Sequence, residues 1–126
     1  MTTPALEVAH LSKRFGGLPA TKDVSLSVMP GERRRLELAM ALAQKPKLLL
    51  LDEPLAGLSQ AERQTVRALL DAIPRDVTIV MIEHDMDTAL GFAERITVLH
   101  YGEVIVEGTR AEVVADPRTR EVYLGD

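Results

Sequence analysis

Four consecutive leucines at residues 48–51 run directly into two carboxylates, Asp52 and Glu53. A strand that is apolar at every position is typical of a parallel sheet covered on both faces. Open α/β sheets place their ligands at the carboxyl ends of such strands. At that place Asp52 is suited to hold Mg²⁺, and Glu53 to orient or deprotonate a water that attacks a phosphoryl group. The alternative is a buried strand that ends in an acidic turn, and the sequence that follows bears on the choice.

Composition narrows the class of protein. A chain of 126 residues with 46% hydrophobic residues is long enough for one domain with a core, so we expect residues 1–126 to form a single domain. The absence of cysteine excludes a disulfide scaffold and a thiolate zinc site and fits a cytosolic protein. No apolar stretch reaches the roughly 18–20 residues of a membrane span, and no signal peptide is visible. Residues 46–126 carry eight Lys/Arg against fifteen Asp/Glu, a balance that disfavours nucleic-acid binding.

The hydrophobic pattern predicts alternating strands and helices. Strands are expected at residues 6–11, 24–28, 48–51, 77–82, 96–99 and 104–106, and helices at 32–44, 59–73, around 90–93 and from 109 to about 116. A loop that contains Phe15 joins the first two strands. Ser59 with Glu62 and Thr109 with Glu112 have the spacing of capping boxes. Alternation of this kind predicts an α/β fold with a parallel core, in which 48–51, 77–82 and 96–99 are the core strands.

Several segments resemble one family. Residues 48–54 look like the Walker B motif of an ATP-binding cassette (ABC) ATPase, and residues 55–59 like the D-loop that follows it. Glu83-His84-Asp85 resembles the switch-histidine region, residues 12–17 the N-terminal segment with an adenine-stacking aromatic, and residues 101–109 the hairpin after the switch histidine. Residues 116–126 are similar to the subgroup that energises branched-chain amino-acid uptake. The resemblance covers nearly the whole chain in family order, and it implies a partial P-loop NTPase fold with a small antiparallel N-terminal portion.

The resemblance also implies roles for individual residues. Asp52 would hold Mg²⁺, Glu53 would be the catalytic base, His84 would contact the γ-phosphate of ATP, and Phe15 would stack on adenine. Two of these residues have simpler alternatives: His84 could be a strand-end histidine bonded to backbone, and Phe15 could be a packing residue. Ser59 stands where many family members carry the aspartate that names the D-loop, and a serine there is also a good helix N-cap.

One part of the family pattern is missing. No G-x-x-x-x-G-K-[ST] phosphate loop occurs in the sequence. Residues 29–34 resemble the approach to that loop, whereas residues 31–37 resemble the tail of the signature motif, of which Gly31 and Glu32 would be the remnant. An internal deletion at this join would separate an N-terminal portion (1–31) from the remainder (32–126). It would remove the Walker A loop, the glutamine loop, the helical subdomain and most of the signature.

Two functions follow as hypotheses. The first is an ATP-binding and ATP-hydrolysing subunit, working as a homo- or heterodimer with a membrane permease on the cytoplasmic face of the membrane, for branched-chain amino-acid import. The second is a catalytically inactive remnant with at most a protein-interaction role. The missing phosphate loop favours the second for this chain, since the cationic cluster Arg33–Arg34–Arg35 is better suited to a helix surface. Loss of a central strand also predicts self-association through an exposed sheet edge. His10 and His100 have no evident partner, and no role is assigned to them.

Overall fold

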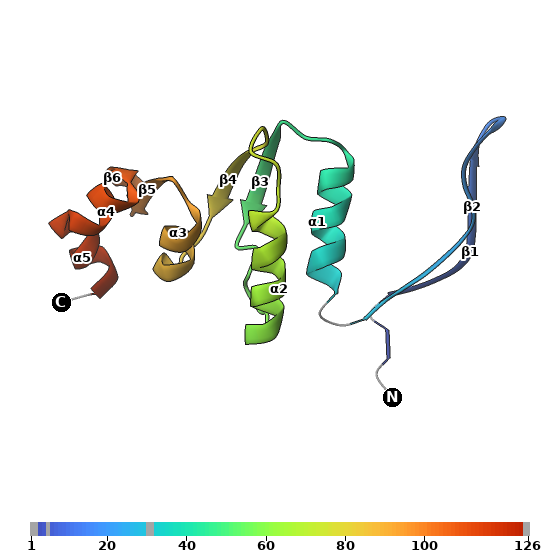
Figure 1. The fold of residues 1–126 in the computed structure, drawn as a ribbon, viewed down its shortest axis with the longest axis horizontal. Coiled ribbons are helices and arrows are strands. Elements are labelled where there is room, and N and C mark those ends of the chain that lie inside the picture. The colour runs from blue at the N-terminus through green and yellow to red at the C-terminus, as the bar shows by residue number, and fades with distance from the viewer. Residues whose placement is uncertain (1–2, 5, 30–31, 125–126) are drawn as a thin grey trace. The chain divides into compact units, whose positions relative to one another are not determined.

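The computed structural model describes residues 3–4, 6–29 and 32–124, and its elements are shown in Figure 1. In chain order they are β1 (Leu6–Phe15), β2 (Leu18–Val28), α1 (Arg33–Ala43), β3 (Leu48–Asp52), α2 (Gln60–Asp71), β4 (Thr78–Ile82), α3 (Met86–Phe92), β5 (Arg95–His100), β6 (Glu103–Thr109), α4 (Arg110–Ala115) and α5 (Pro117–Leu124). Contacts divide the chain into a first unit, residues 1–49 and 54–78, and a second unit, residues 50–53 and 79–126. A single domain over residues 1–126 stays a prediction.

Strands β3 and β4 form a two-stranded sheet and run in the same direction (Figure 1). Thr78 N donates to Lys47 O at 2.9 Å near the start of the strands, and Glu53 N donates to Ile82 O at 2.9 Å at their end. From the first of these hydrogen bonds to the second, the residue numbers rise on both strands, which is the pattern of parallel pairing. The predicted parallel pair is therefore present, with its carboxyl end at Asp52 and Ile82.

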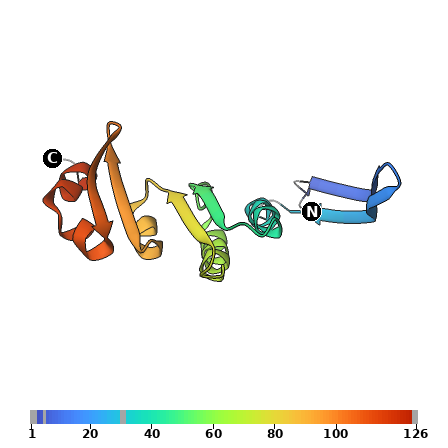
Figure 2. The same ribbon diagram turned by 90° about the horizontal axis from the view of Figure 1, so that it is seen from above.

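The third expected core strand pairs differently. β5 is hydrogen-bonded to β6 in an antiparallel sheet of its own, with Ile96 opposite Gly108 and Val98 opposite Val106 (Figure 2). The hairpin expected at residues 101–109 is therefore present, with its turn at Tyr101 and Gly102. The prediction that residues 96–99 also extend the parallel core is wrong for the described residues, in which β5 pairs with β6 in a sheet separate from β3 and β4. This hairpin has a core of its own, made with α4: Ile96, Val98, Val106 and Val113 are buried together.

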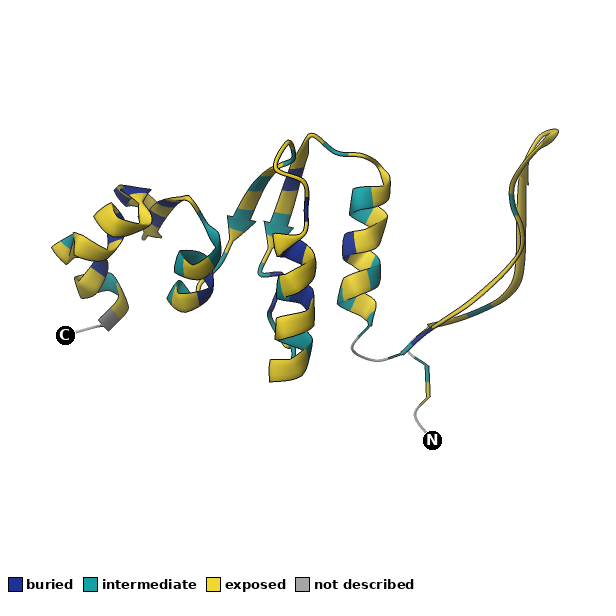
Figure 3. Cartoon of the chain, viewed as in Figure 1, coloured by how far each residue is buried: buried dark blue, intermediate teal, exposed yellow. Residues whose placement is uncertain are grey.

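The pair β3–β4 buries only one of its faces. Leu49 is buried and Leu51, Ile79 and Met81 are half-buried, whereas Leu50, Val80 and Ile82 are 71%, 49% and 62% exposed. The expectation of an apolar strand buried on both sides is therefore wrong for one side. A parallel sheet normally carries a helical layer on each face, and Figure 3 shows exposed and less exposed residues alternating along both strands.

The N-terminal strands are longer than the sequence pattern predicts. β1 and β2 continue to Phe15 and Leu18, which face one another across the turn Gly16–Gly17. Phe15 thus lies at the end of a strand and not in a loop, because Gly16 adopts a φ of +58° and lets the chain reverse within two residues. Of the described hairpin residues only Val28 is buried, and most others are exposed (Figure 3).

Two helices begin where their capping residues predict. Ser59 and Thr109 are the N-caps of α2 and α4, and both capping boxes are formed. The amphipathic α2 buries Val66 and Leu70 in the first unit. Beyond the expected helices, α5 begins at Pro117, a residue suited to the first helical turn. None of the helices in the described residues is both long and apolar enough to cross a membrane.

Candidate active site

Two carboxylates stand at the carboxyl end of the parallel pair. Asp52 is the last residue of β3, and Glu53 follows it with a φ of 44°. A left-handed backbone at a residue other than glycine costs roughly 1–2 kcal/mol. The hydrogen bond from Glu53 N to Ile82 O holds this conformation by tying the turn to the end of β4. An outlier of this kind at a strand end is typical of functional sites.

Glu53 meets His84, which comes from the end of the neighbouring strand. His84 Nδ1 lies 2.6 Å from Glu53 Oε1, a short contact of the charge-assisted type. The hydrogen bond with Glu53, and then the charge of that carboxylate, raise the pKa of His84, to which the charges of Glu83 and Asp85 add. The imidazole side chain is 76% exposed and that of Glu53 is 41% exposed, so both can reach a ligand. The structure thus brings together two of the predicted site residues that are thirty-one positions apart.

The two acidic neighbours of His84 do different things. Asp85 is the N-cap of α3: it accepts a hydrogen bond from Asp87 N at 3.2 Å and one from Thr88 Oγ1 at 2.7 Å. Its carboxylate therefore fixes the start of the helix that follows His84. Glu83 has a buried Oε1 with no hydrogen-bond partner in the described part of the chain. Sequence reasoning gave Glu83 no role, and its only signal was a charged residue directly after an apolar strand.

Asp52 is exposed at the strand end and fits a single metal contact. Within residues 3–4, 6–29 and 32–124, no group of three or more His, Cys, Asp or Glu side chains is placed to hold a metal ion. Mg²⁺ commonly takes one or two protein carboxylates and completes its shell with waters and phosphate oxygens. A single carboxylate such as Asp52 is therefore enough for one protein contact to a nucleotide-bound Mg²⁺.

Phe15 belongs to the first unit and presents an exposed ring. The residue is 66% exposed, and Lys13 Nζ lies 5.4 Å from the ring centroid, within cation–π range. Sequence reasoning missed Lys13, although its i, i+2 spacing from Phe15 places both side chains on one face of a strand. An exposed aromatic ring at a hairpin tip is available for stacking.

The remaining predicted residues have structural partners. Ser59 Oγ accepts from Glu62 N at 3.3 Å, and Ser59 N donates to Glu62 Oε2 at 2.7 Å. Glu32 Oε2 accepts from Met29 N at 2.9 Å at the start of α1. Gly31, the other residue assigned to a signature remnant, lies outside the described residues.

The arginine cluster is engaged on the surface of α1. Arg33 and Arg34 pair with Glu37 at 3.3 and 3.9 Å, and Arg35 pairs with Glu32 at 3.1 Å. These are neighbouring residues of one helix, the spacing at which surface ion pairs form. The helix-surface interpretation agrees with the contacts of Arg33 and Arg35, whereas Arg34 also reaches beyond the helix, where its Nη2 donates to Ala56 O at 3.4 Å.

The sequence of this chain is similar to those of known proteins. Residues 6–56, which include Phe15, Asp52 and Glu53, match the ABC transporter family. The lipopolysaccharide export system ATP-binding protein LptB of Acidithiobacillus ferridurans is 43% identical over 107 residues, which are 84% of this chain and 44% of that protein. The chain is related to the ATP-binding domains of ABC transporters.

Other relatives of this chain carry different names. The high-affinity branched-chain amino acid transport ATP-binding protein LivG of Salmonella typhimurium is 34% identical over 116 residues, 90% of this chain and 46% of that protein. Among solved structures, the ADP conformation of MJ1267, an ATP-binding cassette of an ABC transporter, superimposes with a TM-score of 0.64 at 29% identity, over 79% of this chain and 41% of that one. The fold is accordingly a partial ABC ATPase fold, and the chain spans less than half the length of these relatives.

Proposed function

We propose that this chain is part of an ATP-hydrolysing subunit of an ABC transporter and supplies the residues that activate the attacking water. The observation that carries the proposal is the contact between Glu53 Oε1 and His84 Nδ1 at the carboxyl end of the parallel pair, beside Asp52. A carboxylate fixed by one oxygen keeps the other oxygen for a water molecule, as a general base requires.

The chain's own residues have distinct tasks in this proposal. Glu53 accepts the proton of the attacking water, and His84 fixes the orientation of that carboxylate. The raised pKa of His84 favours the imidazolium, which stabilises the neighbouring Glu53 carboxylate. Asp52 would hold the Mg²⁺ of Mg·ATP, and the bound nucleotide supplies the phosphoryl group that is attacked. Phe15 would stack on the adenine.

The second candidate function is an inactive remnant that contacts other proteins, and the missing phosphate loop favours it for the chain in isolation. In this family backbone amides and a lysine hold the triphosphate. Without them, like charges a few ångströms apart repel by roughly 1–4 kcal/mol. We therefore propose that hydrolysis requires phosphate-binding residues that lie outside this chain.

Partners and cargo are proposed on resemblance alone. A dimer of ATPase subunits on the cytoplasmic face of a membrane permease, in branched-chain amino-acid import, is supported by the similarity of residues 116–126 and by relatives named LivG and BraF. The name of LptB, a lipopolysaccharide export protein, supports a different cargo. Co-purification with the permease of one system and not of the other would decide between them.

The experiment that tests the proposed catalytic role restores the missing part. A family segment that carries the phosphate loop is inserted between Gly31 and Glu32, and ATP turnover is measured. Turnover is expected to appear and to fall at least ~100-fold in Glu53→Gln, since a general base contributes that much. The matched control is Glu103→Gln, which changes an exposed carboxylate at the start of β6 and should leave the rate unchanged. Turnover that survives Glu53→Gln would remove Glu53 as the base, and a chimera that binds no ATP would remove the proposed function.

A further inference from the structure

The β1–β2 hairpin contains three register shifts, and the first two compensate one another. Its successive Cα partners include Leu6–Val28, Val8–Leu26, Leu11–Val24 and Lys13–Thr21. Between Val8 and Leu11, β1 carries one extra residue, and between Thr21 and Val24, β2 carries one. Because these two extra residues lie on opposite strands, the register at Lys13 is the same as the register at Val8. The third shift, between Lys13 and Arg14, adds one residue to β2 and none to β1, so it leaves the alternation of β1 up to Phe15 unchanged.

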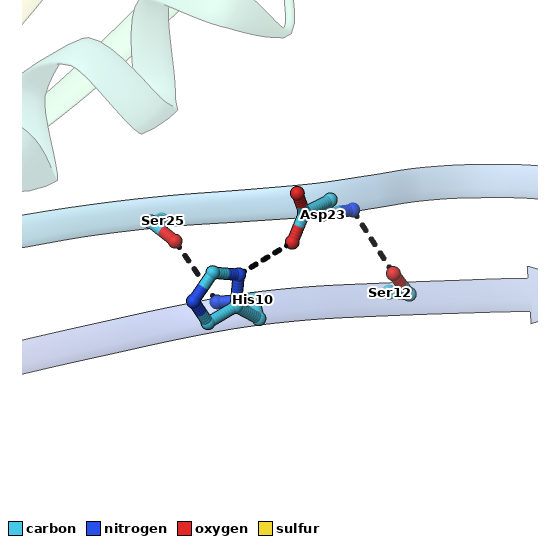
Figure 4. Close-up of polar contacts among 4 residues, drawn as sticks. All are labelled: His10, Ser12, Asp23 and Ser25. Carbon is cyan, nitrogen blue, oxygen red and sulfur yellow. Dashed lines mark hydrogen bonds and ion pairs between the residues drawn. The ribbon is translucent and has the colours of Figure 1, made fainter.

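Each bulge contains one residue in the left-handed conformation, and the two residues hold one another. His10 has a φ of 53° and Asp23 a φ of 52°. His10 Nδ1 lies 2.7 Å from Asp23 Oδ1, His10 N donates to Ser25 Oγ at 2.9 Å, and Asp23 N donates to Ser12 Oγ at 2.9 Å. Figure 4 shows these four side chains reaching across the two strands. We call His10, Ser12, Asp23 and Ser25 the bulge clasp.

The bulge clasp changes which side chains share a face. In a regular strand residues i and i+2 share a face, so residues 10, 12 and 14 would follow Val8. The extra residue in β1 places Leu11 on the face of Val8 instead, and Lys13 and Phe15 follow Leu11. The apolar residues Leu6, Val8 and Leu11 are thus kept on one face although their numbering changes from even to odd. A shift of one residue would turn every following side chain, Phe15 included, to the opposite face.

We propose that His10 and Asp23 are positioning residues that lock the paired bulges and thereby set the face of the hairpin on which Phe15 is presented. The inference rests on the proposed function only in giving Phe15 the task of stacking on adenine. The geometric part stands on the register, the two left-handed residues and their reciprocal contacts. Asparagine tolerates the left-handed conformation and keeps a polar side chain, whereas valine is strongly disfavoured there.

The test uses the full chain and backbone NOEs. In His10→Val/Asp23→Val the bulges are expected to close, so that the cross-strand NOE between residues 11 and 24 is lost and NOEs between 10 and 24 and between 11 and 23 appear. His10→Asn/Asp23→Asn should keep the 11–24 NOE, as should the control Glu7→Ala outside the bulges. A valine variant that retains the 11–24 NOE would overturn the inference, as would an asparagine variant that loses it.

A second variant keeps the inference testable if the valine variant does not fold. Ser12→Ala/Ser25→Ala removes both side-chain acceptors of the bulge clasp without adding a branched residue. The amides of His10 and Asp23 are expected to exchange with solvent at least tenfold faster, and the amides of Glu7 and Ser27 to keep their rates. Unchanged exchange at His10 and Asp23 would overturn the inference.

The proposed role of the bulge clasp in presenting Phe15 to adenine is tested with adenosine as the probe. Adenosine at millimolar concentration should shift the ring protons of Phe15 in the native chain and in the asparagine variant, and at least fivefold less in the valine variant. Equal shifts in the native chain and a valine variant with closed bulges would overturn the positioning role. If the native ring does not respond to adenosine, the adenine contact of the proposed function fails, and the NOE register alone decides the bulge clasp.

Discussion

Replacing Ser59 by alanine tests the start of α2 and, with a matched substitution, the cooperation of the two units. Ser59 exchanges two hydrogen bonds with Glu62, at 3.3 and 2.7 Å, and Thr109 exchanges the same two with Glu112, at 3.4 and 2.7 Å. Loss of an N-cap hydroxyl costs about 1 kcal/mol. For 126 residues that unfold together, the unfolding entropy converts this loss into a fall in Tm of about 4 °C.

The assay is differential scanning calorimetry of Ser59→Ala, Ser59→Asp and Thr109→Ala. Aspartate preserves the cap and adds a favourable charge at the helix N-terminus, so Ser59→Asp should stay within about 0.5 kcal/mol of the native chain. If the units unfold as one, Ser59→Ala and Thr109→Ala each lower a single transition by a similar amount. If they unfold separately, each substitution moves one of two transitions, and by more, because a smaller unit has a smaller unfolding entropy. Ser59→Ala with an unchanged Tm, or Ser59→Asp with the same loss as alanine, would refute the reasoning.

Four further predictions concern nucleotide, pH and association. The chain alone should bind Mg·ATP with a Kd weaker than about 1 mM, roughly −4 kcal/mol, and a micromolar affinity in calorimetric titration would contradict this. Its ATP turnover should equal background and be the same in Glu53→Gln, since a base without a positioned phosphate accelerates nothing; a rate that the variant abolishes would show that other residues hold the phosphates. Glu53 raises the pKa of His84 above 6.5, so the stabilisation of the fold by this pair is complete below pH 6.5 and is lost as pH rises through the raised pKa. NMR titration of the His84 ring should therefore show a lower pKa in Glu53→Gln than in the native chain. An equal pKa in the two would exclude the contact. Finally, the chain should self-associate, so that Tm rises with protein concentration; sedimentation as a monomer at all concentrations, with a concentration-independent Tm above about 65 °C, would argue against it.

The positions of the candidate residues at strand ends were predictable from the sequence. Apolar strands that end in Asp52-Glu53 and in Glu83-His84 bring those ends together when they pair in parallel, and Glu53 and His84 lie 2.6 Å apart. Both capping boxes were also predicted, because a capping box is a local pattern of two residues at fixed spacing. The chemical roles of these residues remain proposals.

Pairings that depend on distant residues were not predictable in the same way. The hairpin between residues 96–99 and 104–106 was predictable from the turn between them, whereas the apolar run itself does not say whether a parallel partner lies on its other edge. Burial of Leu50 and Ile82 was inferred from their apolar character alone, although burial requires a covering layer. The paired bulges left one visible trace, the step of three between Val8 and Leu11 where strand alternation requires two.

Glu53 combines a reactive side chain with a backbone conformation that glutamate does not favour. At a φ of 44°, glycine would relieve the backbone and asparagine would tolerate it better, but either would remove the carboxylate that the proposed function requires. Under that proposal, stability and chemistry favour different residues at this one position. Glu53→Gly should therefore give a chain that is more stable than the native one and that has lost the proposed base.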